Sequence, residues 1–522
     1  MPSLILDSGF TLIKALCEAE AYDHKIASVH LIETHISWVL LTGQYAYKIK
    51  KPVNFGFLDF STLEKRRFFC HEELRLNQRL AAEWYLNVVP ITGQIEHPKM
   101  DGTGEAIEYA VKMVQFPSIQ TLKELGESGQ LGRDEIDQIV NIVANFHNTI
   151  AIADERSPYG NSRDIKHWFV ENFCHIRPLL DDKFQLLQLD AIEAWGHDEW
   201  TSKSPLMQQR KQQGCVRECH GDLHLGNMTL INGKIILFDC IEFNPMLRWI
   251  DVISEVAFLV MDLLHFGYQD YAYRFLNHYL QDTGDYQGLT LLRYYLVYRA
   301  LVRAKVALLR MNQNPDVDIY KEVRSEYAVF ANLAEQFTHD SQTALIITHG
   351  FSGSGKSTFT GQLAEKIGAL QIRSDIERKR LFGYRAQETT DSGIGIYTPE
   401  AGKKTYQHLT ELAKTVLEAG FSAIIDATFL KAEQRNLFRQ LASEYSVKFF
   451  IIDFQASDET LCSRLRQRRD DASEATIDVL YQQQQSAEPL WGEEQNHVIT
   501  INTESDAVIE TLLARIRNVE SH

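Results

Sequence analysis

Residues 350–357 read GFSGSGKS and decide the fold of the C-terminal part of this chain. The apolar run Leu345-Ile346-Ile347 precedes them and a helical pattern follows. Glycines in such a loop let backbone N–H groups surround phosphate oxygens, and the N-terminus of the next helix adds a favourable field. The sequence therefore predicts a phosphate-binding loop between a strand and a helix. The expected nucleotide contacts are Gly350, Phe351, Ser352, Gly353, Ser354, Gly355, Lys356, Ser357 and Thr358.

Two side chains of this loop carry the predicted chemistry. Lys356 supplies a cation at the β- and γ-phosphates of ATP, and Ser357 supplies a ligand for Mg²⁺. A second magnesium group is predicted at Asp426, because it ends the apolar strand Ser422-Ala423-Ile424-Ile425. Asp453 ends the following apolar strand and is the alternative, although an acid at the end of a strand is often only a helix cap.

The sequence around the loop alternates between short apolar strands and helical segments. Apolar runs occur at residues 345–347, 422–425, 449–452 and 498–501. This alternation predicts an α/β fold, a parallel sheet with helices on both faces. A polar stretch at residues 337–342 precedes it, so we place a domain boundary near residue 340. The expected domains are residues 1–340 and 341–522.

A second motif, HGDLHLGN at residues 220–227, lies in the first of these domains. Phosphoryl transfer needs a base for the acceptor hydroxyl, metal ligands and cations around the phosphates. Asp222 fits the base, and Asn227, five residues later, fits a metal ligand. The Asn232-Gly233 pair between apolar runs predicts a hairpin that returns Asp239 beside Asn227 as a second metal ligand. His220 is expected to brace the loop.

This motif resembles the aminoglycoside phosphotransferase and choline-kinase-like branch of the protein-kinase-like fold, which has His-Gly-Asp where protein kinases have His-Arg-Asp. The resemblance covers residues 1–335 and implies a bilobal α+β fold. It also implies that Lys48 pairs with phosphates and that Glu73 holds this lysine, with Lys50 and Glu72 as alternatives. The sequence departs from the family because it has no Gly-rich loop beyond Gly43. A degenerate nucleotide site is therefore an alternative interpretation.

Local patterns in the first domain agree with such a fold. Residues 36–50 predict two strands joined by a turn at Gly43, residues 63–80 a helix, and residues 106–113 a strand. Helices are expected from Arg133 onward and over residues 288–310. The segment at residues 249–252 resembles the start of the family's helix after the catalytic loop, with Asp251 in a structural role.

The segment RSDIERK at residues 373–379 follows the expected second strand of the parallel sheet. It resembles the polynucleotide 5′-kinase, zeta-toxin and gluconate-kinase-like group of P-loop kinases, which implies Asp375 as base and Arg378 as the substrate- or phosphate-binding arginine. The alternative is a helix start with Ser374 as N-cap and Asp375 in the first turn.

The segment from Arg464 to Ala475 also resembles this group's lid. Arg464 and Arg468 lie four residues apart on one helix face and would neutralise charge on the transferred phosphoryl group. The alternative is an ordinary solvated charged face. No helical hexamerisation domain is recognisable, which argues against a ring ATPase. The order of the two domains resembles bacterial fused phosphotransferase/ATP-binding proteins.

Composition limits the partners of the protein. With 53 Lys and Arg against 70 Asp and Glu, the net charge of the 522 residues is −17. This disfavours general binding to nucleic acid, except to a chain end as an acceptor. The longest apolar run, residues 252–264, contains Glu255 and Asp262, and is too short to cross a bilayer. We therefore expect no membrane partner and a cytoplasmic location.

The cysteines do not predict a disulfide framework or a zinc site. The chain has 7 cysteines, an odd number that suits a reducing compartment. A zinc site built from neighbouring side chains is disfavoured, because CxxxC is not a usual structural zinc spacing. The side chains concerned are Cys215, Cys219, His220, His224 and Cys240.

The sequence as a whole predicts Mg-ATP binding at two sites and phosphoryl transfer to a hydroxyl group of a small molecule or nucleotide. One alternative is that only the P-loop domain is catalytic and the first domain recognises the substrate. Another is a nucleotide-dependent switch. Motifs do not fix the acceptor pocket, so the acceptor stays undetermined.

Overall fold

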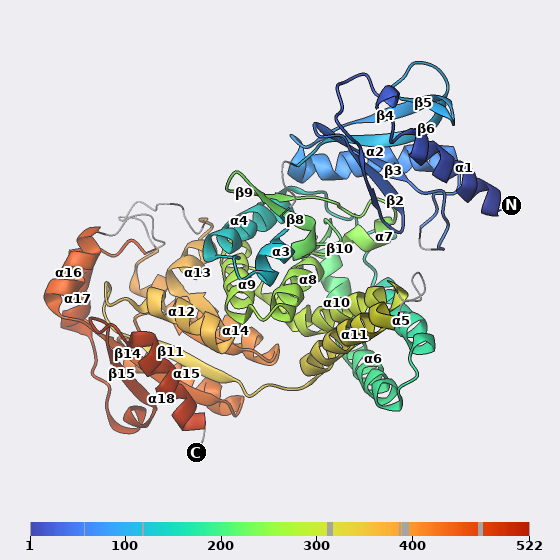
Figure 1. Ribbon diagram of the computed structural model, residues 1–522. Coiled ribbons are helices and arrows are strands. Elements are labelled where there is room, and N and C mark those ends of the chain that lie inside the picture. The colour runs from blue at the N-terminus through green and yellow to red at the C-terminus, as the bar shows by residue number, and fades with distance from the viewer. Residues whose placement is uncertain are drawn as a thin grey trace. The chain divides into compact units, whose positions relative to one another are not determined.

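The computed structural model describes residues 2–56, 58–116, 120–310, 317–385, 388, 396–467 and 473–520 (Figure 1). The chain divides into two compact units. The first comprises Met1–Gln138, Thr149–Ile165 and Leu206–Glu255, and the second comprises Ile139–Asn148, Lys166–Pro205 and Val256–His522. No described helix is long and apolar enough to cross a membrane.

A six-stranded antiparallel sheet forms one part of the first unit, with strand order β1-β2-β3-β6-β4-β5. Helix α2 (Leu63–Ala81) packs on one face beside β4 and β6, around Cys70 and Val111. Helix α1 (Pro2–Ala15) contributes Leu12 and Ile13 to the core on the other face. The strands are β1 (His30–Glu33), β2 (Ser37–Leu41), β3 (Tyr45–Lys50), β4 (Tyr85–Gln94), β5 (His97–Met100) and β6 (Ala106–Val114). The predicted hairpin, helix and strand of this region are present.

The rest of the first unit carries the HGDLHLGN motif between short strands. A two-stranded hairpin, β8 (Met228–Ile231) and β9 (Lys234–Leu237), turns through Asn232 and Gly233, with φ of 50° and 76°. These positive φ values are those that an Asn-Gly turn supplies, so the predicted hairpin is confirmed. The other elements are η1 (Ala19–Ala21), α3 (Leu122–Glu127), β7 (Val216–Glu218), η3 (Leu225–Asn227), α7 (Pro245–Arg248) and β10 (Trp249–Asp251).

The helix expected from residue 249 begins instead at Val252. Trp249–Asp251 form β10, which pairs with β7. The carboxylate of Asp251 accepts a hydrogen bond from the backbone N–H of Ile253 at 3.0 Å and two from the buried Arg210 guanidinium. The side chain therefore starts the helix and anchors it, as its expected structural role requires.

Long helices form one part of the second unit, and α10 and α11 pack along each other. The predicted helix at residues 288–310 is α10 (Leu289–Leu309), and the apolar run at 252–264 is α8 (Val252–His265). The boundaries between the two units fall inside four helices, so the chain passes from one unit to the other within α4, α5, α6 and α8. The remaining elements are α4 (Arg133–Thr149), α5 (Ser162–Ile176), η2 (Arg177–Leu179), α6 (Lys183–Gln212), α9 (Gln269–Thr283), η4 (Tyr286–Gly288) and α11 (Val317–Thr338).

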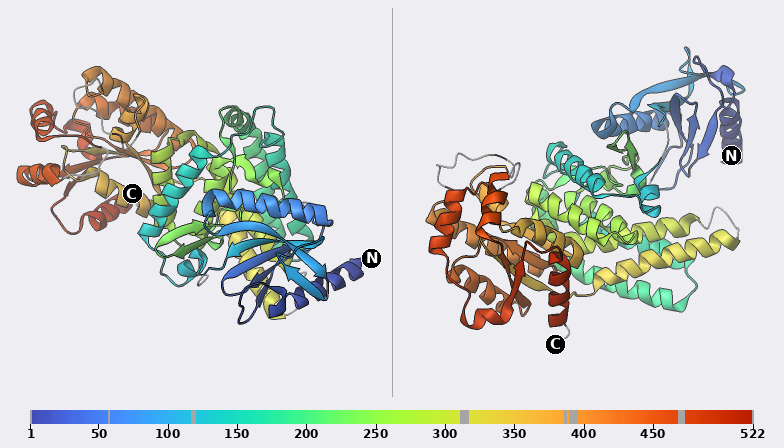
Figure 2. Two further views of the ribbon diagram at one scale, coloured as in Figure 1. Left: turned by 90° about the horizontal axis from the view of Figure 1, so that it is seen from above. Right: turned by 60° about the vertical axis from the view of Figure 1, so that its left-hand side comes forward.

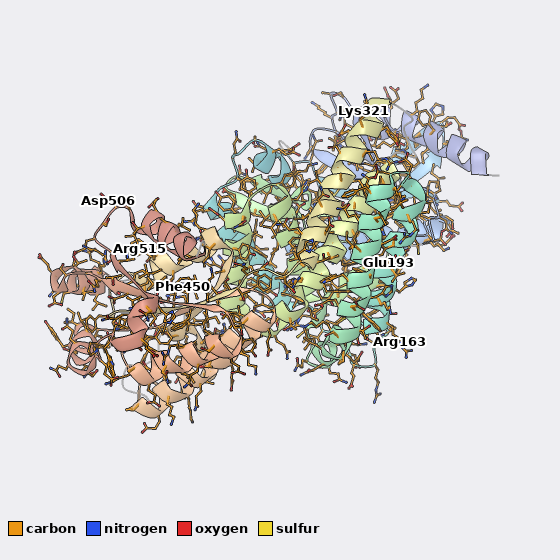
Figure 3. All side chains as sticks on the ribbon, turned by 90° about the horizontal axis from the view of Figure 1, so that it is seen from below. Arg163, Glu193, Lys321, Phe450, Asp506 and Arg515 are labelled. Atoms are coloured by element: carbon orange, nitrogen blue, oxygen red, sulfur yellow. The ribbon has the colours of Figure 1, made fainter. Side chains whose placement is uncertain are left out.

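The other part of the second unit is a parallel five-stranded sheet with order β12-β13-β11-β14-β15. Phe450 of β14, 3% exposed, packs in the core between the sheet and helices α12 and α18 (Figure 3). Helices α14 and α15 pack against β11 and its neighbouring strands. The predicted α/β architecture is confirmed for these strands: β11 (Ala344–His349), β12 (Ala369–Arg373), β13 (Ser422–Asp426), β14 (Lys448–Gln455) and β15 (Val498–Asn502).

Helices cover both faces of this sheet (Figure 2). The helical elements of this region are α12 (Lys356–Ile367), α13 (Ser374–Leu381), α14 (Pro399–Glu418), α15 (Ala432–Glu444), α16 (Asp458–Gln467), α17 (Ile477–Ser486), η6 (Gly492–His497) and α18 (Val508–Glu520), of which α16 and α17 pack against each other. Helix α11 ends at Thr338 and β11 begins at Ala344, on either side of residue 340. However, helices α9 to α11 and this sheet belong to the same compact unit. The division into domains 1–340 and 341–522 therefore stays a prediction.

Candidate functional site

The loop at residues 350–357 connects β11 to α12 and depends on glycine. Gly350, Gly353 and Gly355 have φ of 141°, 87° and 86°, in the region that residues with a side chain rarely adopt. A Cβ on Gly350 would lie 2.6 Å from the carbonyl oxygen of Phe454. The sequence therefore folds here into a glycine-dependent loop that leads directly into the N-terminus of α12.

Lys356 folds back over this loop. Its Nζ donates hydrogen bonds to the carbonyl oxygens of Gly350 at 2.9 Å and Phe351 at 2.7 Å. The side chain is buried. The lysine thus lies across the loop, with its ammonium group against the loop carbonyls. Thr358 is exposed on the first turn of α12.

A glutamine that the sequence analysis did not single out supports the loop. The side-chain oxygen of Gln483 on α17 accepts a hydrogen bond from the backbone N–H of Ser352 at 2.9 Å. Its amide nitrogen donates to Ser352 Oγ at 3.0 Å. Gln483 belongs to a run of four glutamines, and no feature of that run marks one member.

Asp426 ends β13 beside Ser357. Its side chain is 4% exposed, and burial raises its pKa, against the opposing effects of Arg373, a hydrogen bond with Ser357, and Lys356. Asp453 instead accepts a hydrogen bond from His349 Nδ1 at 2.7 Å and one from Gln455. The structure thus brings Asp426 to Ser357, and this hydroxyl and carboxylate oxygen fit the hard ligands that Mg²⁺ prefers.

The residues predicted on the acceptor side lie on α13. Asp375 is in its first turn, but Ser374 is the first helical residue and Arg373 is the N-cap, so the predicted Ser374 cap is wrong. Arg378 donates a hydrogen bond to the carbonyl oxygen of Ile396 at 2.8 Å, and its guanidinium lies 5.2 Å from the ring centre of Tyr397. Burial and the nearby Asp375 raise the pKa of Tyr397 to about 12.

Arg464 on α16 reaches the P-loop. It donates hydrogen bonds to Thr503 Oγ1 at 2.9 Å, to the Thr503 carbonyl at 3.0 Å, and to the carbonyl of Gly353 at 3.4 Å. Arg468 lies outside the described residues. A cavity of about 670 Å³ adjoins the loop, lined among others by Phe351, Phe454, His349 and Asp453. Its volume is in the range of small-molecule sites.

In the first unit, one buried carboxylate forms ion pairs with both candidate lysines. Glu73 Oε1 lies 2.7 Å from Lys48 Nζ, and Glu73 Oε2 lies 2.7 Å from Lys50 Nζ. Lys48 also contacts Asp239 at 2.6 Å, whereas Lys50 is fully buried against Glu242. Burial works against ionisation of Glu73, but the two lysines lower its pKa to about 2. Of the two lysines, Lys48 is the one that reaches the predicted metal ligand.

The HGDLHLGN loop brings the other predicted groups together. Asn227 Nδ2 donates hydrogen bonds to the Asp222 carboxylate at 2.9 Å and to the Asp222 carbonyl at 3.0 Å. The backbone N–H of Phe238 donates to the Asn227 carbonyl at 3.1 Å, so Asp239 follows directly beside Asn227. Asp239 has a φ of 67°. The carboxylate and amide oxygens at this point fit a divalent metal ion.

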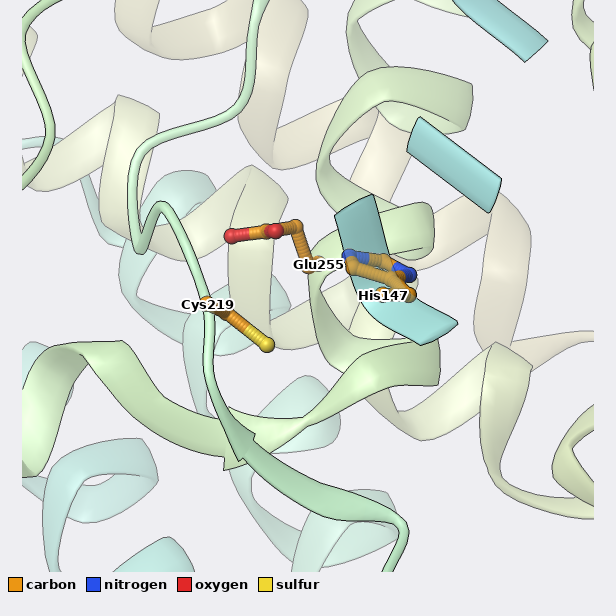
Figure 4. A group of neighbouring side chains, drawn as sticks. All are labelled: His147, Cys219 and Glu255. Carbon is orange, nitrogen blue, oxygen red and sulfur yellow. The ribbon is translucent and has the colours of Figure 1, made fainter. Parts of the chain in front are cut away.

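His220 and Glu255 brace this loop. His220 Nε2 donates to the Phe238 carbonyl at 2.9 Å, and its Nδ1 accepts from the Asp222 backbone N–H at 3.3 Å. The Glu255 carboxylate, shown in Figure 4 with Cys219, accepts from the backbone N–H groups of His220 at 3.2 Å and Gly221 at 2.6 Å. No pattern in the sequence indicates this role of Glu255, which is one of two charges in the apolar run 252–264.

Helix α2 is tied to the segments that flank the loop by a cluster of charges. Glu218 of β7 contacts Arg75 at 2.8 Å, Arg79 at 3.4 Å and Arg248 at 3.2 Å. Glu72, the alternative to Glu73, contacts Arg75 and Arg248 instead of a lysine of β3. Glu73 is therefore the acid of α2 that faces the site, and its neighbour anchors the helix.

Residues 345–490 match the family model described as "AAA domain", which together with the sheet order and the loop defines a P-loop nucleotide-binding domain. Uncharacterized protein Rv2004c of Mycobacterium tuberculosis (strain ATCC 25618 / H37Rv) and Uncharacterized protein Mb2027c of Mycobacterium bovis (strain ATCC BAA-935 / AF2122/97) are each 30% identical over 452 residues. The match covers 86% of this chain and 88% of each relative. The chain belongs to the family of these mycobacterial proteins.

Two solved structures match the C-terminal region at low similarity. A gluconokinase from Sinorhizobium meliloti 1021 has a TM-score of 0.26 and 19% identity, covering 35% of this chain and 99% of that one. A sugar kinase from Janibacter sp. HTCC2649 has a TM-score of 0.26 and 21% identity, covering 34% of this chain and 95% of that one. Similarity at this level assigns no function.

Proposed function

We propose that the protein is a Mg-ATP-dependent phosphotransferase whose P-loop site phosphorylates a hydroxyl group of a small molecule or nucleotide. The observation that carries the proposal is the convergence of Lys356, Ser357 and Asp426 at the carboxyl edge of a parallel sheet, where such folds bind ligands. Asp375 in the first turn and Arg378 in the last turn lie on α13, the helix that follows the neighbouring edge strand β12.

Each of these side chains has a specific role in the proposed phosphoryl transfer. Ser357 and Asp426 would hold Mg²⁺, which would neutralise charge on the β- and γ-phosphates. Lys356 stabilises the same charge, while Asp375 takes the proton from the acceptor hydroxyl. The oxygen of that hydroxyl bonds to the γ-phosphorus, the bond from this phosphorus to the β–γ bridging oxygen breaks, and ADP leaves. Arg378, Arg464 and Arg468 stabilise the transferred group.

The first unit carries a second proposed nucleotide site. Lys48, held by Glu73, would pair with phosphates. Asn227 and Asp239 would hold Mg²⁺, and Asp222 would act as the base. The contacts of Lys48 with Glu73 and Asp239 support this assignment, because the corresponding lysine–glutamate pair must be in place in active protein kinases. The β2–β3 turn has Gly43 alone to cover the phosphates, which favours weaker binding here than at the P-loop.

The test is transfer of labelled phosphate from ATP to pooled cell metabolites and to RNA. Wild type, Asp222→Ala, Lys356→Ala and Asp375→Ala are compared, with the exposed Lys414→Ala on α14 as control. Loss of a general base should lower the rate on the order of 10²–10⁴-fold. The labelled product that disappears with Asp375→Ala and Lys356→Ala belongs to the P-loop site.

The same experiment separates the alternatives. If Asp222→Ala leaves every product unchanged, the first unit recognises a substrate and does not transfer phosphate. If ATP is hydrolysed but no acceptor is labelled, the protein is a nucleotide-dependent switch. Unchanged transfer in both Asp375→Ala and Lys356→Ala would refute the assignment of the P-loop site.

A further inference from the structure

Strand β12 is at the edge of the parallel sheet, and helix α9 covers part of that edge. An edge strand exposes unpaired backbone N–H and C=O groups. The side chain of Asn277 on α9 satisfies two of them: its Nδ2 donates to the Ala369 carbonyl at 3.0 Å, and its Oδ1 accepts from the Gln371 N–H at 2.7 Å. All of these residues belong to the second unit. One amide thus replaces a neighbouring strand at this point.

The side chain of Gln371 extends this contact to the P-loop site. Its Nε2 donates to Thr360 Oγ1 at 2.8 Å and to the Ser357 carbonyl at 3.2 Å, and lies 3.5 Å from Asp426 Oδ2. Its Oε1 accepts from Gln281 of α9 at 3.3 Å. Gln371 is 5% exposed. A single buried amide therefore lies between α9 and both groups assigned to Mg²⁺.

Helix α9 also contacts the element that carries the acceptor-side residues. Arg380 of α13 donates a hydrogen bond to the Gln281 carbonyl. A Cβ on Gly284, which follows α9 with a φ of 74°, would lie 2.6 Å from Arg380 Nε, so the backbone approaches this arginine closely. The same turn of α9 thus holds β12 and α13.

We propose that Asn277, Gln281 and Gln371 are positioning residues for the P-loop site, through which helix α9 orients Ser357 and Asp426 toward Mg²⁺. The proposal rests on the proposed function of that site and adds a part of the chain outside residues 341–522 to it. Partners behind metal ligands fix ligand orientation, and their loss typically lowers metal affinity or activity about 10- to 100-fold.

Other contacts of α9 provide a matched control. Asp270 pairs with Lys366 on α12, and the two side chains are 38% and 50% exposed. This pair joins the same two elements, α9 and α12, but does not contact Gln371, Ser357 or Asp426. Asp270→Asn therefore changes the same interface without touching the proposed connection.

The test measures ADP affinity by calorimetry, with Mg²⁺ and with EDTA, in full-length protein carrying Lys48→Met to weaken the first site. Gln371→Met and Asn277→Leu keep side-chain size and remove the hydrogen bonds. The gain in ADP affinity from Mg²⁺ should fall about 10- to 100-fold in both variants, while metal-free affinity and the affinity of Asp270→Asn stay unchanged.

Two results would overturn the proposal. The first is that Mg²⁺ raises the ADP affinity of Gln371→Met as much as that of the parent protein. The second is that the variants lose ADP affinity equally with and without Mg²⁺, which indicates a general disturbance of the site. If Asn277→Leu does not fold, Asn277→Asp, which keeps the acceptor for the Gln371 N–H, gives the same comparison. Lys356→Ala tests the site itself: if it leaves Mg-ADP binding intact, the proposed function fails independently of Gln371.

Discussion

Lys48 and Lys50 are two residues apart on β3, so both point to the same face of the strand and both reach Glu73. Only their other partners distinguish them. Lys48 contacts the half-exposed Asp239, whereas Lys50 is enclosed by Glu242 and the ring of Phe60. The first arrangement suits ligand binding, and the second suits support of the fold.

Lys48→Met and Lys50→Met should therefore have different effects. Lys48→Met should abolish nucleotide binding at the first site and cost less stability than Lys50→Met, because Glu73 keeps Lys50 as a partner and Asp239 is half-exposed. Lys50→Met should lower the free energy of unfolding by about 3 kcal/mol, because it leaves buried Glu242 without its partner. Calorimetry and urea denaturation measure the two effects, and the reverse pattern would assign the phosphate contact to Lys50.

Glu73 gives a pH dependence of stability. Its pKa in the folded protein is about 2, below the ordinary value of 4.5, because the attraction of Lys48 and Lys50 outweighs burial. A depressed carboxyl pKa stabilises the fold above pH 4.5, and this stabilisation is lost as pH falls toward 2. Glu73→Gln should cost about 3 kcal/mol at pH 7. In urea titrations from pH 7 downward the difference should shrink below pH 4.5; a difference independent of pH would contradict it.

Asp426 and Asp453 are the two alternative magnesium ligands that the sequence predicts for the P-loop site. Asp426→Asn should weaken Mg-dependent nucleotide binding at the P-loop at least tenfold, since it removes a carboxylate beside Ser357. Asp453→Asn is the matched control, because Asp453 also lies near the carboxyl end of a strand of this sheet, β14, but contacts His349 and Gln455. Equal effects of the two variants on affinity in Mg²⁺, measured by calorimetry, would refute the assignment.

At the scale of elements, α2 is held in place by charges as well as by packing. Glu218 is buried and receives three arginines, two of them from α2. Glu218→Ala should lower the free energy of unfolding by about 3 kcal/mol, because it leaves the largely buried Arg248 without this partner. Arg75→Ala should cost less, since that side chain is 47% exposed. Urea denaturation compares the two, and a larger loss for Arg75→Ala would contradict this account.

At the scale of the whole molecule, the two proposed nucleotide sites predict a binding stoichiometry of about two Mg-ADP per chain. Lys356→Ala and Lys48→Met should each reduce it to about one, and the double variant should bind none, since each lysine serves a separate unit. Isothermal calorimetry at high protein concentration measures the number of sites. One site in wild type, lost with Lys356→Ala alone, would show that the first unit does not bind nucleotide.

Local patterns were sufficient to predict much of the structure. Three features depend only on neighbours in the sequence and can therefore be predicted without the tertiary structure. They are the glycine loop at residues 350–355, the Asn232-Gly233 turn, and the alternation of apolar strands with helices. Errors occurred at element ends: Ser374 is not the N-cap of α13, and the helix expected at Trp249 begins at Val252. The ends of elements depend on tertiary contacts, such as the pairing of β10 with β7.

The amino-acid sequence determined by itself that a phosphate-binding loop follows a buried strand and that Asp222, Asn227 and Asp239 come from one short region. Those features follow from backbone chemistry and from spacing along the chain. The tertiary structure alone shows that Lys48, and not Lys50, contacts Asp239, and that Asp426 lies beside Ser357. It alone places Asn277 against β12, 92 residues from Ala369. These contacts depend on which groups fold next to one another and become buried together, and spacing along the chain does not encode that.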